Sequence, residues 1–264
     1  MELEGALLGE LRALQGNPVL AYSGGVDSSY LLALLAESRG KDGFLAVIGV
    51  SASLAARQLA QARAVAALLG VPLVELGTHE LDRPEYRANL GDRCFYCKDT
   101  LYATLRGLYP QAVILDGSQR DDAQGHRPGR EAARLHGVQS PLMDAALGKT
   151  EIRALSARRS LPTADLPATP CLASRFPAGT PVSAEGLARV EAAEDLLHAL
   201  GLREFRVRHH EGGVARVEVL PADLARLAGT PLGQAVVAGL KSLGFRFVTV
   251  DLEGFRSGSS STLS

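Results

Sequence analysis

The residues best placed for chemistry in this sequence form a short loop of small and polar residues between positions 20 and 30. An apolar run ends at Ala21 and an apolar-periodic helix covers Tyr30 to Ala36, so the loop joins a strand to a helix N-terminus. Two glycines let the backbone approach an anion closely, and the first helical amides point into the turn. A glycine-rich turn without a ligand is the alternative, and a Walker A pattern is absent. The candidate nucleotide-binding residues are Ser23, Gly24, Gly25, Asp27, Ser28 and Ser29.

A second polar segment, Leu115–Asp122, follows a later apolar run. We assign its first carboxylate, Asp116, to cofactor binding, and we expect the adjacent Asp121 and Asp122 to hold Mg²⁺ near bound phosphates. A polar turn without a metal is the alternative for this segment. The arginines of His126–Arg130 belong to a loop that could fold over the same site, although exposed arginines are more often solvated.

The three cysteines are Cys94, Cys97 and Cys171. The first two lie at the start of an expected helix that runs to Leu108, and their spacing puts both thiols on one side. Three converging thiolates would suit a [4Fe-4S] cluster with one iron left open, because thiolates are soft ligands. A structural zinc site completed by one of the six histidines is one alternative, and ordinary buried cysteines are the other.

Basic residues alternate along a later strand, Phe205–His210. A period of two puts Arg206 and Arg208 on one face together with His210, and the apolar residues on the other. Such a basic ridge suits a substrate phosphate, since a guanidinium binds phosphate through paired N–H groups. An amphipathic edge strand with solvated arginines is the alternative.

The elements that must position these residues alternate between strands and helices. One helix covers Leu3–Leu14, and a longer one, capped by Ser53, runs to Leu69. The alternation predicts an α/β fold with a doubly wound, parallel five-stranded sheet, in which ligands bind at the carboxyl ends of the strands. The expected strands are Val19–Ala21, Phe44–Val50, Pro72–Leu76, Val113–Leu115 and Val138–Leu142.

The periodic pattern stops at a proline-rich stretch, where the chain is expected to divide. In the smaller, C-terminal α+β domain Ser183 caps a helix through Leu200, and a hairpin around Glu211–Gly213 precedes a last strand at Phe247–Val250. The expected divisions are residues 1–160 for the first domain, 161–181 for the linker that carries Cys171, 182–254 for the domain of substrate binding or oligomerisation, and 255–264 for a disordered tail.

Composition limits the function classes. With 264 residues, 46% of them hydrophobic, the chain can bury the cores of two ordinary domains. A formal net charge of −1 provides no field that would gather nucleic acid, so we expect no nucleic-acid partner. No run of about 18 apolar residues and no basic-then-apolar leader occurs, which predicts a cytoplasmic protein without a membrane partner. We also expect a homo-oligomer.

The segment Ser23–Ser28, Ser-Gly-Gly-Val-Asp-Ser, resembles the loop of the ATP pyrophosphatase (PP-loop) superfamily, which splits ATP into AMP and pyrophosphate to adenylate a substrate oxygen. With later segments in the same order, the chain resembles the LarE-type ATP-dependent sulfur transferases over nearly its whole length. Gln119 departs from the family pattern, where we would expect asparagine. The later segments are Asp116–Asp122, Arg127–Arg130, Ser140–Leu142, Cys171–Arg175 and Glu204–His210.

The resemblance implies ATP and Mg²⁺ as cofactors and a pyridinium-3,5-dicarboxylate mononucleotide as substrate. In the family a carboxylate is adenylated and sulfur replaces AMP; two rounds give the dithiocarboxylate that becomes the nickel-pincer nucleotide cofactor of lactate racemase. By the same resemblance Cys171 bears the sulfur, Asp27 and Ser174 take part in catalysis, and Glu194 is a further candidate Mg²⁺ ligand.

The family has two ways of supplying the sulfur. One branch sacrifices the sulfur of the cysteine that matches Cys171, which leaves dehydroalanine. Another branch holds a [4Fe-4S] cluster with three cysteines, and the three-cysteine pattern is present here. A sulfide or a cysteine desulfurase would then be the sulfur source.

Three other function classes make different demands. A tRNA-thiolating enzyme should show a basic surface and an RNA-binding module. An amidotransferase-like synthetase would use ammonia and need no cysteines at its site. A nucleotide sensor would bind ATP without releasing pyrophosphate.

Overall fold

The structure, a computed structural model, describes residues 2–123 and 127–256. The expected disordered tail, Ser257–Ser264, lies outside the described residues, as does His126 of the arginine loop. The chain divides into two compact units. The first comprises residues 1–80 and 94–169, and the second comprises residues 81–93 and 170–264.

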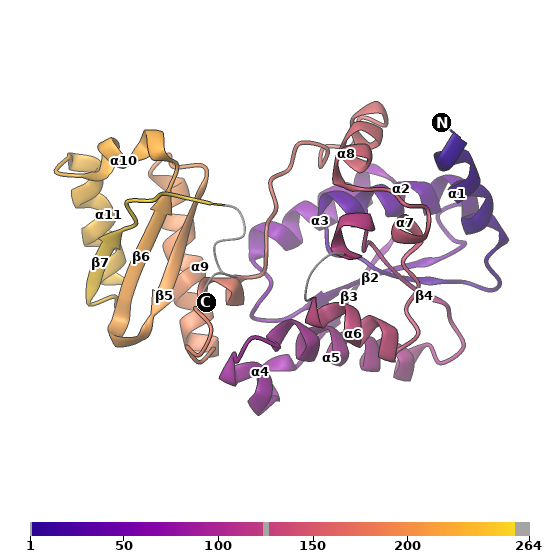
Figure 1. The fold of residues 1–264 in the computed structure, drawn as a ribbon, viewed down its shortest axis with the longest axis horizontal. Coiled ribbons are helices and arrows are strands. Elements are labelled where there is room, and N and C mark those ends of the chain that lie inside the picture. The colour runs from indigo at the N-terminus through magenta and orange to yellow at the C-terminus, as the bar shows by residue number, and fades with distance from the viewer. Residues whose placement is uncertain (1, 124–126, 257–264) are drawn as a thin grey trace. The chain divides into compact units, whose positions relative to one another are not determined.

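The first unit is built on a parallel sheet of four strands in the order β3-β2-β1-β4 (Figure 1). Val19 of the central strand pairs with Leu45 on one side and Ile114 on the other, so the carboxyl ends of the strands share one edge. The central strand is completely buried, as expected for a parallel sheet covered on both faces. The strands are β1 Val19–Ala21, β2 Leu45–Val50, β3 Leu73–Gly77 and β4 Ile114–Asp116.

Helices cover both faces of this sheet, which confirms the α/β class. Leucines of α1 and α2 form one buried layer, and Tyr102 and Leu105 of α5 pack with α6 on the opposite face. The helices are α1 Glu2–Ala13, α2 Val26–Arg39, α3 Ala56–Leu68, α5 Arg93–Leu108, α6 Pro128–Leu135, α7 Pro141–Asp144 and α8 Lys149–Arg158, with 3₁₀ turns at η1 Glu80–Asp82 and η2 Arg120–Ala123. None of the helices in the described part of the chain is long and apolar enough to cross a membrane.

The expected fifth strand, Val138–Leu142, is wrong. Among the described residues only a single bridge, between Leu115 and Gln139, extends the sheet beyond β4. Pro141 then begins α7, because its ring fixes a helical φ and it has no N–H to give to a strand ladder.

The start of α3 lies three residues beyond Ser53, the residue expected to cap it. The helix begins at Ala56 after an extended Ala55, whose own side chain makes no capping hydrogen bond. Ser53 is buried in the preceding turn, where its backbone N–H donates to the Ser51 hydroxyl at 3.2 Å. The Ser51 hydroxyl therefore holds the turn between β2 and α3.

The second unit contains a sheet of three strands, in the order β5-β6-β7. Strands β5 and β6 form the expected antiparallel hairpin, whereas β7 lies parallel to β6. Ser183 caps α9 by accepting a hydrogen bond from the Gly186 N–H at 3.1 Å, which confirms that prediction. The elements are η3 Leu172–Arg175, α9 Ala184–Ala199, β5 Phe205–His210, η4 Glu211–Gly213, β6 Val214–Val219, α10 Pro221–Leu227, α11 Pro231–Ser242 and β7 Phe247–Val250.

Residues 81–93, which include α4 Pro84–Ala88, belong to the second unit. Asn89 ends α4 in a left-handed conformation with φ 54° and is buried. Its side-chain amide donates to the carbonyls of Phe176, Pro177 and Thr180, at 3.3, 2.8 and 3.0 Å. This early segment therefore orders the proline-rich stretch by satisfying its backbone acceptors.

Candidate functional site

The glycine loop, residues 23–29, follows β1 and leads into α2. Gly24 has φ 76°, and a Cβ atom there would lie 2.8 Å from the Cβ of Ala62 on α3, so both conformation and space require glycine. Gly25 precedes the helix in an extended conformation and, being glycine, has no side chain that could cap α2. The strand, turn and helix N-terminus predicted from the sequence are all present.

The serines of the glycine loop face different ways. The hydroxyls of Ser23 and Ser28 lie 2.9 Å apart, and Ser28 also donates to the Gly25 carbonyl at 3.3 Å. Ser29 instead is fully buried, and its hydroxyl lies 3.1 Å from that of Tyr22. Ser29 therefore supports the loop from the core side, which differs from the nucleotide contact expected for it.

Asp27 meets a lysine that the sequence analysis did not identify. Lys149, the first residue of α8, places its ammonium 2.7 and 2.9 Å from the two carboxylate oxygens of Asp27. Burial raises the pKa of Asp27, more than the Lys149 ammonium lowers it, and the nearby carboxylate of Asp122 raises it further. Asp27 and Lys149 are 122 positions apart, and no local sequence pattern indicates that they pair.

Asp116, at the end of β4, is buried and surrounded by donors. The Lys98 ammonium lies 3.2 Å from it, the Tyr102 hydroxyl 3.0 Å, and the hydroxyls of Ser118 and Ser140 2.8 Å each. Burial opposes its ionisation, but Lys98 and the serine hydroxyls hold the pKa of Asp116 below its ordinary value. Its oxygens are therefore bonded to the protein, and they fix the end of β4 against α5.

The two expected Mg²⁺ ligands differ in their surroundings. Asp121 accepts the Lys149 backbone N–H at 2.9 Å, and this bond lowers the pKa of Asp121. Asp122 accepts the Gln119 N–H at 3.2 Å and lies 3.4 Å from the Arg127 guanidinium. Asp121 thus caps α8, whereas Asp122 lies near enough to Asp27 for its negative charge to raise the pKa of Asp27. No group of three or more histidine, cysteine, aspartate or glutamate side chains in the described ranges is arranged to hold a metal ion.

Gln119, at the position where the family pattern led us to expect asparagine, has a local structural role. Its side chain is buried, and the amide oxygen accepts the Asp121 N–H at 2.9 Å. Arg130 lies 3.5 Å from the carbonyls of Asp122 and Ala123. Both side chains hold the turn η2, which carries the two aspartates.

The cysteines are distributed over the two units. Cys94 is exposed and Cys97 partly exposed in the first turns of α5, where a spacing of three residues puts both on one side. Cys171 is partly exposed at the start of η3 in the second unit.

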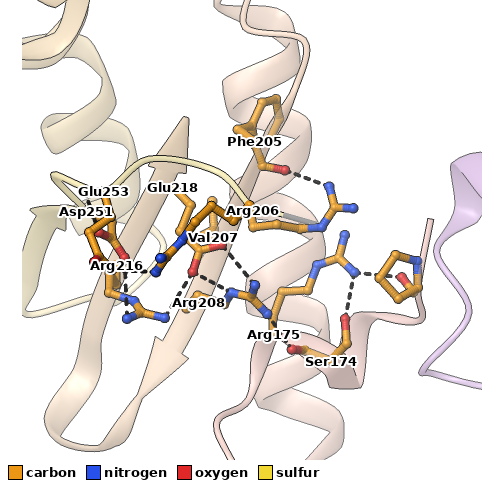
Figure 2. A network of polar contacts seen from close by, with 12 residues as sticks. Ser174, Arg175, Phe205, Arg206, Val207, Arg208, Arg216, Glu218, Asp251 and Glu253 are labelled. Atoms are coloured by element: carbon orange, nitrogen blue, oxygen red, sulfur yellow. Dashed lines mark hydrogen bonds and ion pairs between the residues drawn. The ribbon is translucent and has the colours of Figure 1, made fainter. Parts of the chain in front are cut away.

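The cysteine turn, residues 170–175, is held by Arg175, which is 3% exposed. Its Nη1 donates to the carbonyls of Pro170 and Cys171 at 2.6 and 3.1 Å. The same nitrogen lies 3.0 Å from the Ser174 hydroxyl, as Figure 2 shows. Its other two nitrogens bind both carboxylate oxygens of Glu194 at 2.9 and 2.8 Å.

Glu194 was expected to be an Mg²⁺ ligand, and its contacts do not support that role. One carboxylate oxygen accepts both Arg175 Nε and the Val207 backbone N–H, the latter at 3.1 Å, and the other accepts Arg175 Nη2. Glu194 therefore joins the cysteine turn to β5.

The two arginines of the basic strand have different surroundings. Arg208 is buried; its Nε and Nη2 bind Glu218 at 2.9 Å each, and its Nη1 donates to the Ser174 carbonyl at 2.8 Å. Arg206 is partly exposed, donates to the Phe205 carbonyl at 2.8 Å and stacks over the Phe255 ring at 4.8 Å. Burial and the positive charges of Arg175 and Arg208 lower the pKa of Arg206 to about 10. Of the two, Arg206 is the more exposed, and the positive charges of Arg175 and Arg208 act on it.

Three known proteins are similar to this chain over at least 90% of its length. An uncharacterised protein from Synechocystis is 38% identical over 244 residues, which cover 91% of this chain and 90% of that protein. The pyridinium-3,5-bisthiocarboxylic acid mononucleotide synthase of Lactiplantibacillus plantarum is 33% identical over 255 residues, 96% of this chain and 91% of the synthase. An uncharacterised protein from Methanocaldococcus jannaschii is 27% identical over 242 residues, 90% of each chain. No protein-family model matches the sequence.

Proposed function

Because this chain belongs to the family of the pyridinium-3,5-bisthiocarboxylic acid mononucleotide synthase, the LarE-type proteins, we propose that it is an ATP-dependent sulfur transferase acting on a pyridinium-3,5-dicarboxylate mononucleotide. The observation that carries the proposal is the 33% identity to that synthase over 96% of this chain. The glycine loop and the cysteine turn, which the proposed chemistry needs, both lie within the part of the chain that the structure describes.

The first proposed step is adenylation. A substrate carboxylate oxygen attacks the α-phosphorus of ATP, a P–O bond breaks, and pyrophosphate leaves with the electron pair. This step is needed because a carboxylate has no good leaving group, whereas the acyl adenylate can release AMP. The glycine loop supports this step, since its glycines let the backbone approach a bound phosphate closely. The N-terminus of α2 follows Gly25, which has no side chain, so its amides can face an anion.

Asp27, Asp122 and Lys149 are the proposed electrostatic partners of the phosphates. A magnesium ion held by Asp27 and Asp122 would bind phosphate oxygens and offset charge on pyrophosphate as it leaves. The donor set fits, because both are carboxylates and burial with mutual repulsion disfavours the charge of Asp27 in the absence of a cation. Lys149 would release Asp27 to the ion and turn its ammonium to the phosphates.

In the second proposed step a sulfur nucleophile attacks the acyl carbon of the adenylate, AMP leaves, and a thiocarboxylate forms. If Cys171 is the nucleophile, a thioester forms, and elimination of the cysteine Hα with C–S cleavage would leave dehydroalanine. If Cys94, Cys97 and Cys171 together hold a [4Fe-4S] cluster, that cluster would supply external sulfide instead. Cys94 and Cys97 suit it as neighbouring thiols on one helix.

The test of the whole proposal is product analysis. Incubation with Mg-ATP and the dicarboxylate mononucleotide should give AMP, pyrophosphate and a thiocarboxylate, separated by ion-exchange chromatography and identified by mass. Formation of ADP and phosphate would contradict the assignment, as would pyrophosphate release with no dependence on the mononucleotide.

The close approach of the two loops at the sheet edge gives one prediction. A Cβ atom at Gly117 would lie 2.8 Å from the Ser28 backbone nitrogen, and neither backbone can give way easily. Gly117→Ala should therefore displace the start of α2 and raise the KM for ATP by roughly tenfold. Steady-state pyrophosphate release measures this. Gly77→Ala is the matched control, since a Cβ there has open space, and equal KM values in the two variants would show that the loops do not depend on this contact.

The surroundings of Arg206 give a second prediction. Arg206→Ala should raise the KM for the dicarboxylate mononucleotide by about ten- to a hundredfold, because a charge-assisted hydrogen bond to the substrate phosphate is worth roughly 1.5–3 kcal/mol. The KM for ATP should stay within about twofold. Arg203→Ala, at an exposed position before β5, should change neither constant. A loss confined to ATP would assign Arg206 to the nucleotide instead.

A further inference from the structure

The backbone around Cys171 is fixed from two sides by buried ion pairs. Arg175 and Glu194 form one pair, with side chains 3% and 14% exposed, and Arg208 and Glu218 form the other, with side chains 7% and 1% exposed. Both arginines reach the same short turn. Figure 2 shows their guanidinium groups meeting at Ser174, where Arg175 binds the hydroxyl and Arg208 the carbonyl.

Arg175 acts on the peptides that flank the cysteine. Its Nη1 holds the carbonyls of Pro170 and Cys171, the acceptors immediately before and after the Cα atom that bears the thiol. The turn is tightened further by the Ser174 N–H, which donates to the Cys171 carbonyl at 2.9 Å. The main chain of Cys171 is therefore fixed while its side chain stays partly exposed.

Stability alone does not explain why two buried ion pairs hold the cysteine turn. Removing a pair of charges from water costs about as much as their attraction returns, so well-packed apolar residues would hold a linker at least as firmly. A guanidinium fork can, however, bind a carboxylate and several carbonyls at once in one fixed geometry. Two such guanidinium groups bind a turn that contains one partly exposed thiol, which indicates that they control the position of that thiol.

We propose that Arg175, anchored by Glu194, is a positioning residue for Cys171, with Arg208 and Glu218 as a second anchor through Ser174. The inference rests on the proposed function in so far as Cys171 takes part in sulfur transfer. The arginine does not touch substrate in this account. It sets the direction in which the thiol leaves the turn, so its loss should impair the chemical step more than ligand binding.

The test is Arg175→Lys, which keeps the positive charge but cannot bind Glu194 and the carbonyls together. Timed alkylation with iodoacetamide, read by peptide mass spectrometry, gives the rate at Cys171 relative to Cys94 in the same molecules. We expect this ratio to rise by about tenfold or more as the turn loosens. The kcat for thiocarboxylate formation should fall by about ten- to a hundredfold, while the KM for ATP stays unchanged.

Arg39→Lys is the matched control. Arg39 also gathers backbone carbonyls, among them those of Leu14 and Gly43 at 2.8 and 2.9 Å, but it lies in the first unit. It should lower the melting temperature without changing the alkylation ratio. If Arg175→Lys is too unstable to purify, Glu194→Gln weakens the same anchor and should raise the ratio less.

An unchanged ratio and an unchanged kcat in folded Arg175→Lys would overturn the proposal and leave Arg175 a stabilising residue only. The alkylation ratio needs no turnover, so it tests the position of Cys171 even if the wild-type protein forms no thiocarboxylate. Absence of thiocarboxylate from the wild-type reaction would refute the proposed function and leave the positioning role intact.

Discussion

Cys171→Ala should abolish thiocarboxylate formation while ATP is still converted to AMP and pyrophosphate. The residues proposed for adenylation belong to the first unit, so loss of this thiol should remove the sulfur step and leave the earlier step in place. The fall in thiocarboxylate should reach at least about 10³-fold, as is usual when a nucleophile is removed. Chromatography of product and a coupled pyrophosphate assay measure the two steps separately.

Cys171→Ser is the control for size, since it keeps a small polar side chain without a thiolate. Both variants should behave alike. Undiminished thiocarboxylate formation in either would exclude Cys171 from sulfur transfer, and loss of pyrophosphate release as well would place Cys171 in the adenylation step.

Cys94→Ala separates the two sulfur routes. With a cluster, it should lose iron and turnover together, and anaerobically purified wild-type protein should contain about four iron and four sulfide per chain. With sacrifice of Cys171, Cys94→Ala should keep its activity, and each wild-type chain should lose about 34 Da after one turnover.

Asp27→Ala should reduce pyrophosphate release by about 10²–10³-fold. Its carboxylate is the proposed Mg²⁺ ligand beside the phosphates, and removing one preorganised electrostatic partner of a developing charge typically costs this much. The variant also leaves the Lys149 ammonium without the partner it has at 2.7 Å. Initial rates of pyrophosphate release at several Mg²⁺ concentrations measure the effect.

Asp121→Ala is the matched control for Asp27→Ala. Its carboxylate accepts the Lys149 backbone N–H at the start of α8, so its loss should lower the melting temperature slightly and cost little activity. If Asp121→Ala were as inactive as Asp27→Ala, the metal site would have to include Asp121, and an active Asp27→Ala would refute the proposed adenylation site.

The sequence predicted the elements that depend on local patterns. The glycine loop was found because a buried strand, two glycines and a helix start follow each other directly. The hairpin β5–β6 and the Ser183 cap were found for the same reason, since period-two alternation and a capping serine are local signals.

Contacts between residues that are far apart in the sequence could not be predicted from it. Lys149 reaches Asp27 across 122 positions of the chain, and nothing near either residue indicates the pairing. Periodicity correctly put Arg206 and Arg208 on one face, but it could not show that Glu218, on the neighbouring strand, binds Arg208 through both of its carboxylate oxygens. The contacts of Glu194 with Arg175 and Val207 were not predicted, because a carboxylate that binds a metal and one that binds a guanidinium look the same in a sequence.

The second unit is not a continuous piece of the chain, and this limits how it could have been acquired or exchanged. A gene fragment that starts at the linker would omit residues 81–93, and with them the Asn89 amide that satisfies the carbonyls of Phe176, Pro177 and Thr180. Recombination at the proline-rich stretch alone would therefore separate two segments that are hydrogen-bonded to each other. The two units are expected to be inherited together. During synthesis, residues 81–93 leave the ribosome before the proline-rich stretch that they contact, so the second unit cannot form until that stretch has been made.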